Sequence, residues 1–133
     1  MEISDEYKYG FLVGIIEGEG CVSIQKLGKK KHCISGQIVI VNTDKNLINI
    51  IDEILRSLNF KYSIRNHHTV DYIKKTGNKE AWRIVITNRI DFEKLLPYYR
   101  IEGSIKKKKL EEIINSRKRK LYKRGLICHN IIF

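Results

Sequence analysis

The stretch from residue 10 to residue 20 constrains this fold most, because an uncharged run leads straight into two carboxylates, Glu17 and Glu19. Glycines recur at every fourth position of the run, at Gly10, Gly14 and Gly18. On a helix this spacing puts all three on one face, where another backbone can approach closely because no side chain intervenes. Since apolar residues surround the rest of the helix, one side should face the core of its own domain and the glycine side a partner.

The composition favours a polyanionic partner. The chain has 133 residues, the length of one domain, and its 26 Lys and Arg against 15 Asp and Glu give a formal charge of +11. Nucleic acid is the first candidate for such a surplus and an anionic membrane surface the second. No apolar run is long enough to span a bilayer, and the acidic N-terminus is not a signal peptide. We therefore expect an intracellular protein without a membrane partner, with cytoplasm and organelle both left open.

The cysteines do not indicate a metal site. Cys21, Cys33 and Cys128 are odd in number and lack the paired spacing of zinc ligands, so we expect reduced thiols.

Hydrophobic periodicity predicts the order α-β-β-α-β-β-α-α. Ser4 suits the N-cap of a first helix over 7–18, and Thr43 or Asn42 can cap a second helix that begins at Asp44. Two hairpins are expected from the alternating segments, the second closed by a long polar loop: 20–27 with 32–42, and 61–68 with 81–88. Asp91 is expected to cap a short helix ending near Pro97, and Gly103-Ser104 to open the last helix.

Each predicted strand alternates apolar and polar residues, which describes a sheet with helices on one face and the other face bare. The bare face would carry side chains that contact phosphates and base edges: Ser23, Gln25, Ser35, Gln37, Lys61, Ser63, Arg65, His67, Arg83 and Thr87. A basic tip, Lys29, Lys30 and Lys31, joins the first two strands. A solvated sheet face is the alternative interpretation, and the basic charge favours DNA in the major groove.

Glu19 suggests a metal site. A carboxylate at the C-terminal end of a helix is repelled by the carbonyl ends unless a cation lies there. Mg²⁺ prefers carboxylate and carbonyl oxygens, and phosphate can complete its shell. A pair of ordinary surface glutamates, Glu17 and Glu19, is the alternative.

Residues 12–20 resemble the nine-residue signature of the LAGLIDADG homing endonuclease family. They match it at Leu12, Gly14, Ile16 and Gly20, with Val13 for Ala, Ile15 for Leu and Glu for both acids. The resemblance covers residues 1–116 and leaves 117–133 as a basic C-terminal tail. It implies an α+β fold, an αββαββα unit whose antiparallel four-stranded sheet forms a DNA-binding saddle with helices on its other face.

The family implies a site-specific double-strand DNA endonuclease that hydrolyses phosphodiester bonds with Mg²⁺ or Mn²⁺ at a long, near-palindromic site. Because the chain has one motif, it implies a homodimer joined along Gly10, Gly14 and Gly18. Intron RNA is a further partner to consider.

Site residues follow from the resemblance position by position. Glu19 would bind the metal together with the carbonyl of Gly18, and Asn42 would organise water at the site. Lys106 would stabilise the transition-state phosphate, with Lys107 and Arg100 as alternatives. Glu17 would cap or brace the helices of the dimer and would not bind metal.

Two other functions stay open. An intron RNA maturase or a non-cleaving DNA-binding relative would share the fold, and the basic tail would supply phosphate contacts to either. A ribosome-associated basic protein would explain the charge but not the glycine helix.

Overall fold

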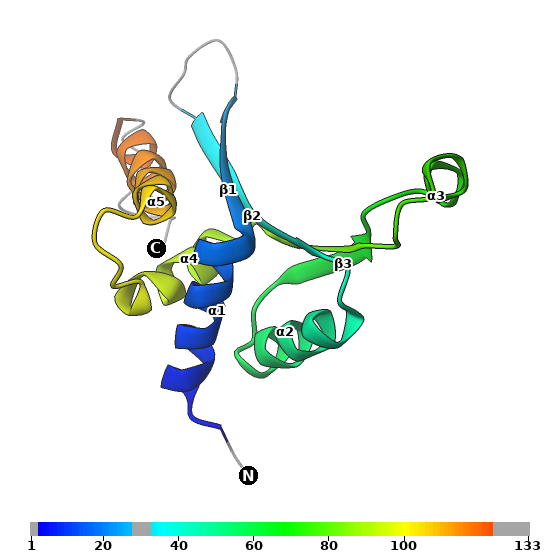
Figure 1. Ribbon diagram of the computed structural model, residues 1–133. Helices are drawn as coiled ribbons and strands as arrows, with labels where there is room; N and C mark the ends of the chain where they lie inside the picture. Colours follow the sequence, from blue (N-terminus) through cyan, green and yellow to red (C-terminus); the bar gives the residue numbers. More distant parts are fainter. Residues whose placement is uncertain (1–2, 28–32, 124–133) are drawn as a thin grey trace.

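A four-stranded antiparallel sheet organises the fold. The computed structural model describes residues 3–27 and 33–123 (Figure 1). The sheet has the order β1-β2-β4-β3, with the strands β1 (Gly20–Leu27), β2 (Cys33–Asn42), β3 (Tyr62–Asn66) and β4 (Trp82–Ile86). Both predicted hairpins are confirmed by the antiparallel pairs β1 with β2 and β3 with β4. The tip Lys29 to Lys31 lies outside the described residues.

Helices cover one face of this sheet, which makes the expected α+β architecture. The helices are α1 (Asp5–Glu19), α2 (Lys45–Ser57), α3 (Val70–Thr76), α4 (Arg89–Leu95), the short 3₁₀ helix η1 (Leu96–Tyr98) and α5 (Ile105–Lys123), and α3 alone of these stands apart from that face. Helices α1, α2 and α5 pack on the strands, while α4 and η1 lie against α1 and α5 (Figure 1). Among the described residues, no helix combines the length and the apolar character of a membrane span.

The core lies between the sheet and the helices. Inward side chains of the strands are buried, among them Val22, Ile38, Ile40, Ile84 and Ile86. Gly36 lets α5 come close to β2, because a Cβ at that position would lie 2.0 Å from Cδ1 of Ile113. Alternation along the strands therefore predicts correctly which face is buried.

Two of the predicted helix caps are wrong. The side chain of Asp44, and not Thr43 or Asn42, caps α2, because its Oδ1 accepts from the backbone N–H groups of residues 46 and 47. Asn88, not Asp91, caps α4 in the same way. Asp91 is 2% exposed. Its carboxylate accepts from the backbone N–H of Lys61, so it joins α4 to the start of β3.

Two other helix starts agree with prediction. The Ser4 hydroxyl accepts from the backbone N–H of Tyr7 at the start of α1, and Ser104 accepts from that of Lys107 at the start of α5. Helix α5 runs to Lys123, through the expected boundary at 116, and the division into domain and tail stays a prediction.

The polar loop of the second hairpin contains a helix that was not predicted. Helix α3 is capped by Thr69 and ends at Gly77, whose φ of 69° suits glycine. It stands away from the other helices (Figure 1), and none of its residues is buried. A helix without a buried face has no apolar periodicity, so hydrophobic spacing could not reveal it.

Candidate active site

The end of α1 is shaped by Gly20, which turns the chain from the helix into β1. Its backbone N–H donates to the carbonyls of Ile15 and Ile16. A Cβ at Gly20 would lie 2.8 Å from the Ile16 carbonyl oxygen and 2.9 Å from the Ile16 Cα. Only glycine fits this turn without a backbone shift. Glu19 is consequently the last residue of α1, and its side chain is exposed.

Asn42 meets Glu19 from the end of β2. Its Nδ2 donates to Oε2 of Glu19 at 2.8 Å. Its Oδ1 accepts from the backbone N–H of Asp44 at 2.7 Å. Since the backbone N–H can only donate, it defines which amide atom is the oxygen and turns the NH₂ group toward Glu19. The structure thus brings together two residues that are 23 positions apart in sequence.

Lys106 reaches the same helix end from the first turn of α5. Its ammonium donates to the carbonyls of Ile16 at 3.0 Å and Glu17 at 2.7 Å. A cation is favourable there because the last carbonyls of a helix carry partial negative charge. Lys106 therefore supplies a cation at the end of α1, where the sequence argument expected one. The repulsion between Glu19 and the helix carbonyls thus does not by itself require a metal ion. Of the alternatives, Arg100 donates to the carbonyl of Pro97 instead.

Glu17 is held within its own chain. The hydroxyls of Tyr99 and Ser104 both donate to its Oε2, the latter at 2.7 Å. These hydrogen bonds, that of Tyr99 first, lower the pKa of Glu17 below its ordinary value. Tyr99 is fully buried, and burial followed by the bond to Glu17 raises the pKa of its hydroxyl. Glu17 is thus an ionised carboxylate with two fixed donors.

We call these six residues the helix-end cluster: Glu17, Glu19, Asn42, Tyr99, Ser104 and Lys106. Sequence reasoning singled out Ser104 only as a helix start and missed Tyr99. No sequence pattern links either hydroxyl to a carboxylate more than 80 positions away.

Within residues 3–27 and 33–123, no group of three His, Cys, Asp or Glu side chains is arranged to hold a metal ion. Any divalent ion at Glu19 would therefore need further ligands from a substrate or from a second copy of the chain.

The outer side of the sheet carries the polar face expected from alternation. Ser23 lies opposite Gln37, and Gln25 opposite Ser35. Residues directly opposite each other share a face. We call this surface the open face: Ser23, Gln25, Ser35, Gln37, Ser63, Arg65 and Arg83, with Cys21, Val39, Val41 and Val85 between them. Three predicted residues, Lys61, His67 and Thr87, lie one position beyond the strand ends.

Arg65 and Arg83 are directly opposite each other on the open face. Two like charges in such a pair are destabilising. In addition, the Nε of Arg83 is buried without a hydrogen-bond partner in the part of the chain that is described. A bound anion would relieve both costs.

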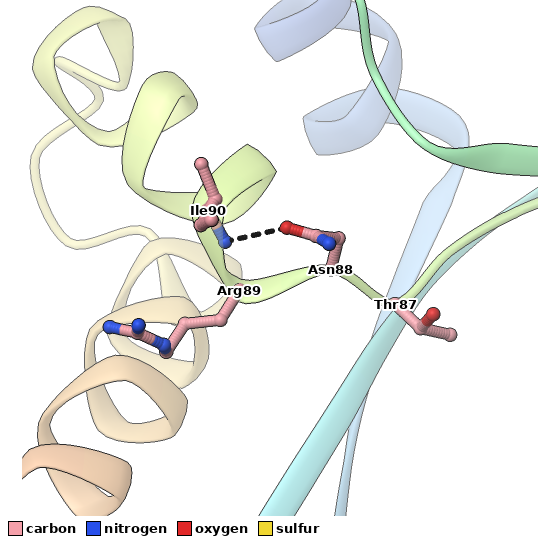
Figure 2. Close-up of a pocket in the computed structure, with 4 residues that line it drawn as sticks. All are labelled: Thr87, Asn88, Arg89 and Ile90. Atoms are coloured by element: carbon pink, nitrogen blue, oxygen red, sulfur yellow. Dashed lines mark hydrogen bonds between the residues drawn. The ribbon is translucent and has the colours of Figure 1, made fainter. Parts of the chain in front are cut away.

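A shallow pocket lies elsewhere, where β4 passes into α4, and is lined by Thr87, Asn88, Arg89 and Ile90 (Figure 2). Asn88 accepts from the backbone N–H of Ile90 at 2.8 Å, and Arg89 pairs with Glu93 at 2.9 Å. The lining holds no carboxylate, thiol or imidazole, so the helix-end cluster is the stronger candidate for chemistry.

The glycine face of α1 is open. Gly10, Gly14 and Gly18 are exposed, and a Cβ at any of them would meet nothing within 4 Å. The exposed side chain of Tyr7 (62% exposed) continues the same stripe at helical spacing, and the exposed Ile3 precedes the N-cap of α1.

Residues 6–100 match the family model of the LAGLIDADG-like domain. The chain belongs to the LAGLIDADG family. The family signature occupies the second half of α1, where Leu12, Val13 and Ile16 are buried and Gly20 makes the turn. A comparison with curated proteins yields no match.

Solved structures of homing endonucleases share the fold. The homing endonuclease I-CvuI in complex with its target is 17% identical, with a TM-score of 0.55 over 96% of this chain and 85% of that one. The archaeal intron-encoded I-Vdi141I, complexed with DNA, is 16% identical, with a TM-score of 0.54 over 97% and 89%. The group I intron-encoded I-CeuI, also complexed with DNA, is 21% identical, with a TM-score of 0.52 over 94% and 60%. At these identities the likeness establishes the fold.

Proposed function

We propose that this protein is a site-specific double-strand DNA endonuclease that hydrolyses phosphodiester bonds with Mg²⁺ or Mn²⁺. The observation that carries the proposal is the helix-end cluster, in which Glu19, Asn42 and Lys106 converge although three different elements supply them. Family membership supports it. So do the solved relatives, which are homing endonucleases described in complex with DNA.

Duplex DNA would lie along the open face. The chain enters β1 immediately after Glu19, so the exposed carboxylate adjoins the strands that would read the DNA. Gln and Ser side chains can contact base edges, and Arg binds guanine or phosphate in a bidentate manner. The opposed pair Arg65 and Arg83 and the formal charge of +11 both favour a polyanion.

The residues present suit a divalent ion shared with the substrate. Mg²⁺ is commonly held by one or two carboxylates together with substrate phosphates and water. Glu19 and the carbonyl of Gly18 would be this chain's ligands, and the ion would activate water and stabilise charge on the phosphate oxygens. In support, I-CvuI was solved with its target in the presence of Ca, and with another target in the presence of Mg, where the DNA was not cleaved.

Around that position the protein's own groups have separate tasks. Asn42 holds the Glu19 carboxylate in one orientation and would organise the attacking water. Lys106 uses two ammonium protons on carbonyls of α1, which leaves a third for a phosphate oxygen as negative charge develops. Glu17 would serve as a structural carboxylate and not as a metal ligand, because two hydroxyls from outside α1 hold its Oε2 within the chain.

A homodimer along the glycine face would complete the site. Two copies joined at α1 would present one Glu19 to each DNA strand, as double-strand cleavage requires. The proposal is supported by the exposed stripe of Tyr7, Gly10, Gly14 and Gly18 on α1, where a Cβ at any of the three glycines would meet nothing within 4 Å in the described part of the chain.

The test is cleavage of a plasmid library with randomised duplex inserts in the presence of Mg²⁺. We expect cuts within one recurring sequence, near-palindromic if the enzyme is a dimer, and no cuts when a chelator removes the ion. Cutting that survives chelation would refute the metal-dependent mechanism. Retained duplex binding without cutting would instead favour the non-cleaving relative, and preferential binding of structured intron RNA would favour the maturase.

A further inference from the structure

A continuous set of hydrogen bonds ties the start of α5 to the end of α1. The backbone N–H of Lys107 donates to Oγ of Ser104 at 3.1 Å. The same hydroxyl donates to Oε2 of Glu17 at 2.7 Å. The hydroxyl of Tyr99 donates to that oxygen too. One carboxylate oxygen on α1 therefore anchors both the residue after η1 and the N-cap of α5.

The two residues that donate to this half-buried carboxylate lie inside the protein. Tyr99 is 0% exposed and Ser104 is 5% exposed. Hydrogen bonds to an ionised carboxylate are about twice as strong as those between neutral groups, and they gain further where water is excluded.

Lys106 depends on the anchor for its place. It follows the α5 cap by two residues, and its ammonium crosses to the carbonyls of Ile16 and Glu17, about 90 positions away in sequence. A lysine side chain is flexible and loses considerable rotamer entropy when it is held in one position. If α5 started slightly farther from α1, the ammonium would not reach both carbonyls.

We infer that Tyr99 is a positioning residue: through Glu17 it holds the first turn of α5 against α1 and so keeps the Lys106 ammonium on the carbonyls of Ile16 and Glu17. The consequence for cleavage rests on the proposed function. The consequence for the position of Lys106 does not.

The matched variants are Tyr99→Phe and Tyr98→Phe. Each removes one tyrosine hydroxyl and keeps the ring. The ring of Tyr98 stacks on Tyr9, with centroids 4.4 Å apart, and has no part in the helix-end cluster. We expect Tyr99→Phe to slow single-turnover cleavage at saturating enzyme by about tenfold. Tyr98→Phe should match the wild type.

A double-mutant cycle distinguishes positioning from general loosening. In a Lys106→Met background, Tyr99→Phe should cost no further rate, because the group that it positions is gone. Equal losses in both backgrounds would overturn the inference. Should Tyr99→Phe fail to fold, Glu17→Gln takes its place in the same cycle, since it keeps the shape of the side chain and removes the charge.

A readout independent of cleavage is the ¹H–¹⁵N signal of the Lys106 ammonium, assigned by its absence in Lys106→Met. Hydrogen-bonded to two carbonyls, this group should exchange slowly with water in the wild type and in Tyr98→Phe, and the signal should be lost in Tyr99→Phe. A signal that persists in Tyr99→Phe would overturn the inference. If the wild type cut no DNA but the signal were lost as expected, the proposed function would fail and the positioning role would stand.

Discussion

The helix-end cluster and the open face are both polar, but their side chains are held in different ways. In the cluster, Glu17, Asn42 and Lys106 each have fixed partners before any substrate arrives. On the open face, Arg65 and Arg83 oppose each other, and the buried Nε of Arg83 has no partner among the described residues. Chemistry needs groups that are positioned in advance, whereas recognition needs groups left free for the ligand. The predictions that follow test this division of roles.

The largest effect is expected from Glu19→Gln. The amide cannot supply the charged oxygen that a divalent ion needs, so the cleavage rate should fall by about a thousandfold or more. Affinity for the duplex should change little, because the open face is untouched. Cleavage and binding assays on the variant, with the exposed Glu53→Gln as control, separate the two. A Glu19→Gln protein that still cut its site would remove Glu19 from the mechanism.

Gly14→Leu tests whether cleavage requires two copies of the cluster. Nothing in the same chain lies within 4 Å of a Cβ at Gly14. Leucine also favours helix more than glycine does, by about 1 kcal/mol. The isolated chain should therefore stay folded while a dimer is wedged apart, and cleavage should fail together with dimerisation. Sedimentation that found an unchanged dimer, or a monomeric wild type, would contradict the proposed interface. A larger residue at Gly18 should act in the same way.

Arg83→Ala should act on recognition alone. If Arg83 contacts a base or phosphate, its loss should weaken duplex binding by about 1–3 kcal/mol and leave the cleavage rate at saturation unchanged. Removing one of two opposed charges should also make the free protein slightly more stable. Binding titrations, saturation kinetics and thermal unfolding measure the three quantities. A slower cleavage rate with normal duplex affinity would contradict the assignment of recognition to the open face and chemistry to the helix-end cluster.

The smallest effect concerns pH and Glu17. Because hydrogen bonds from Tyr99 and Ser104 lower the pKa of Glu17, the folded state binds fewer protons there than the unfolded state does. This stabilisation is complete above the ordinary value of 4.5 and is lost as the pH falls through the lowered pKa. Lys106 also faces this carboxylate and lowers its pKa further. Unfolding followed from neutral to acidic pH should show a shallower loss of stability in Glu17→Gln. An identical pH dependence would mean that Glu17 is not held as described.

Patterns that are local in sequence predicted most of the fold. The alternation of apolar and polar residues predicted the strands and the buried face of the sheet. The preference of serine for helix N-termini predicted the caps at Ser4 and Ser104. The caps of α2 and α4 were misplaced because Asn42, Asp44, Asn88 and Asp91 are all good capping residues, and a preference shared by neighbours cannot choose between them. Helix α3 was missed because it buries nothing.

By itself, the sequence determined the family, the order of the strands along the chain, the open glycine face and the exposed carboxylate at the end of α1. All of these depend on residues close together in the chain. Only the tertiary structure decided that Lys106 reaches α1 and that Tyr99 and Ser104 hold Glu17. Those contacts join residues more than 80 positions apart. They depend on how η1 and α5 pack against α1, and that packing is a property of the assembled core, which local spacing does not encode.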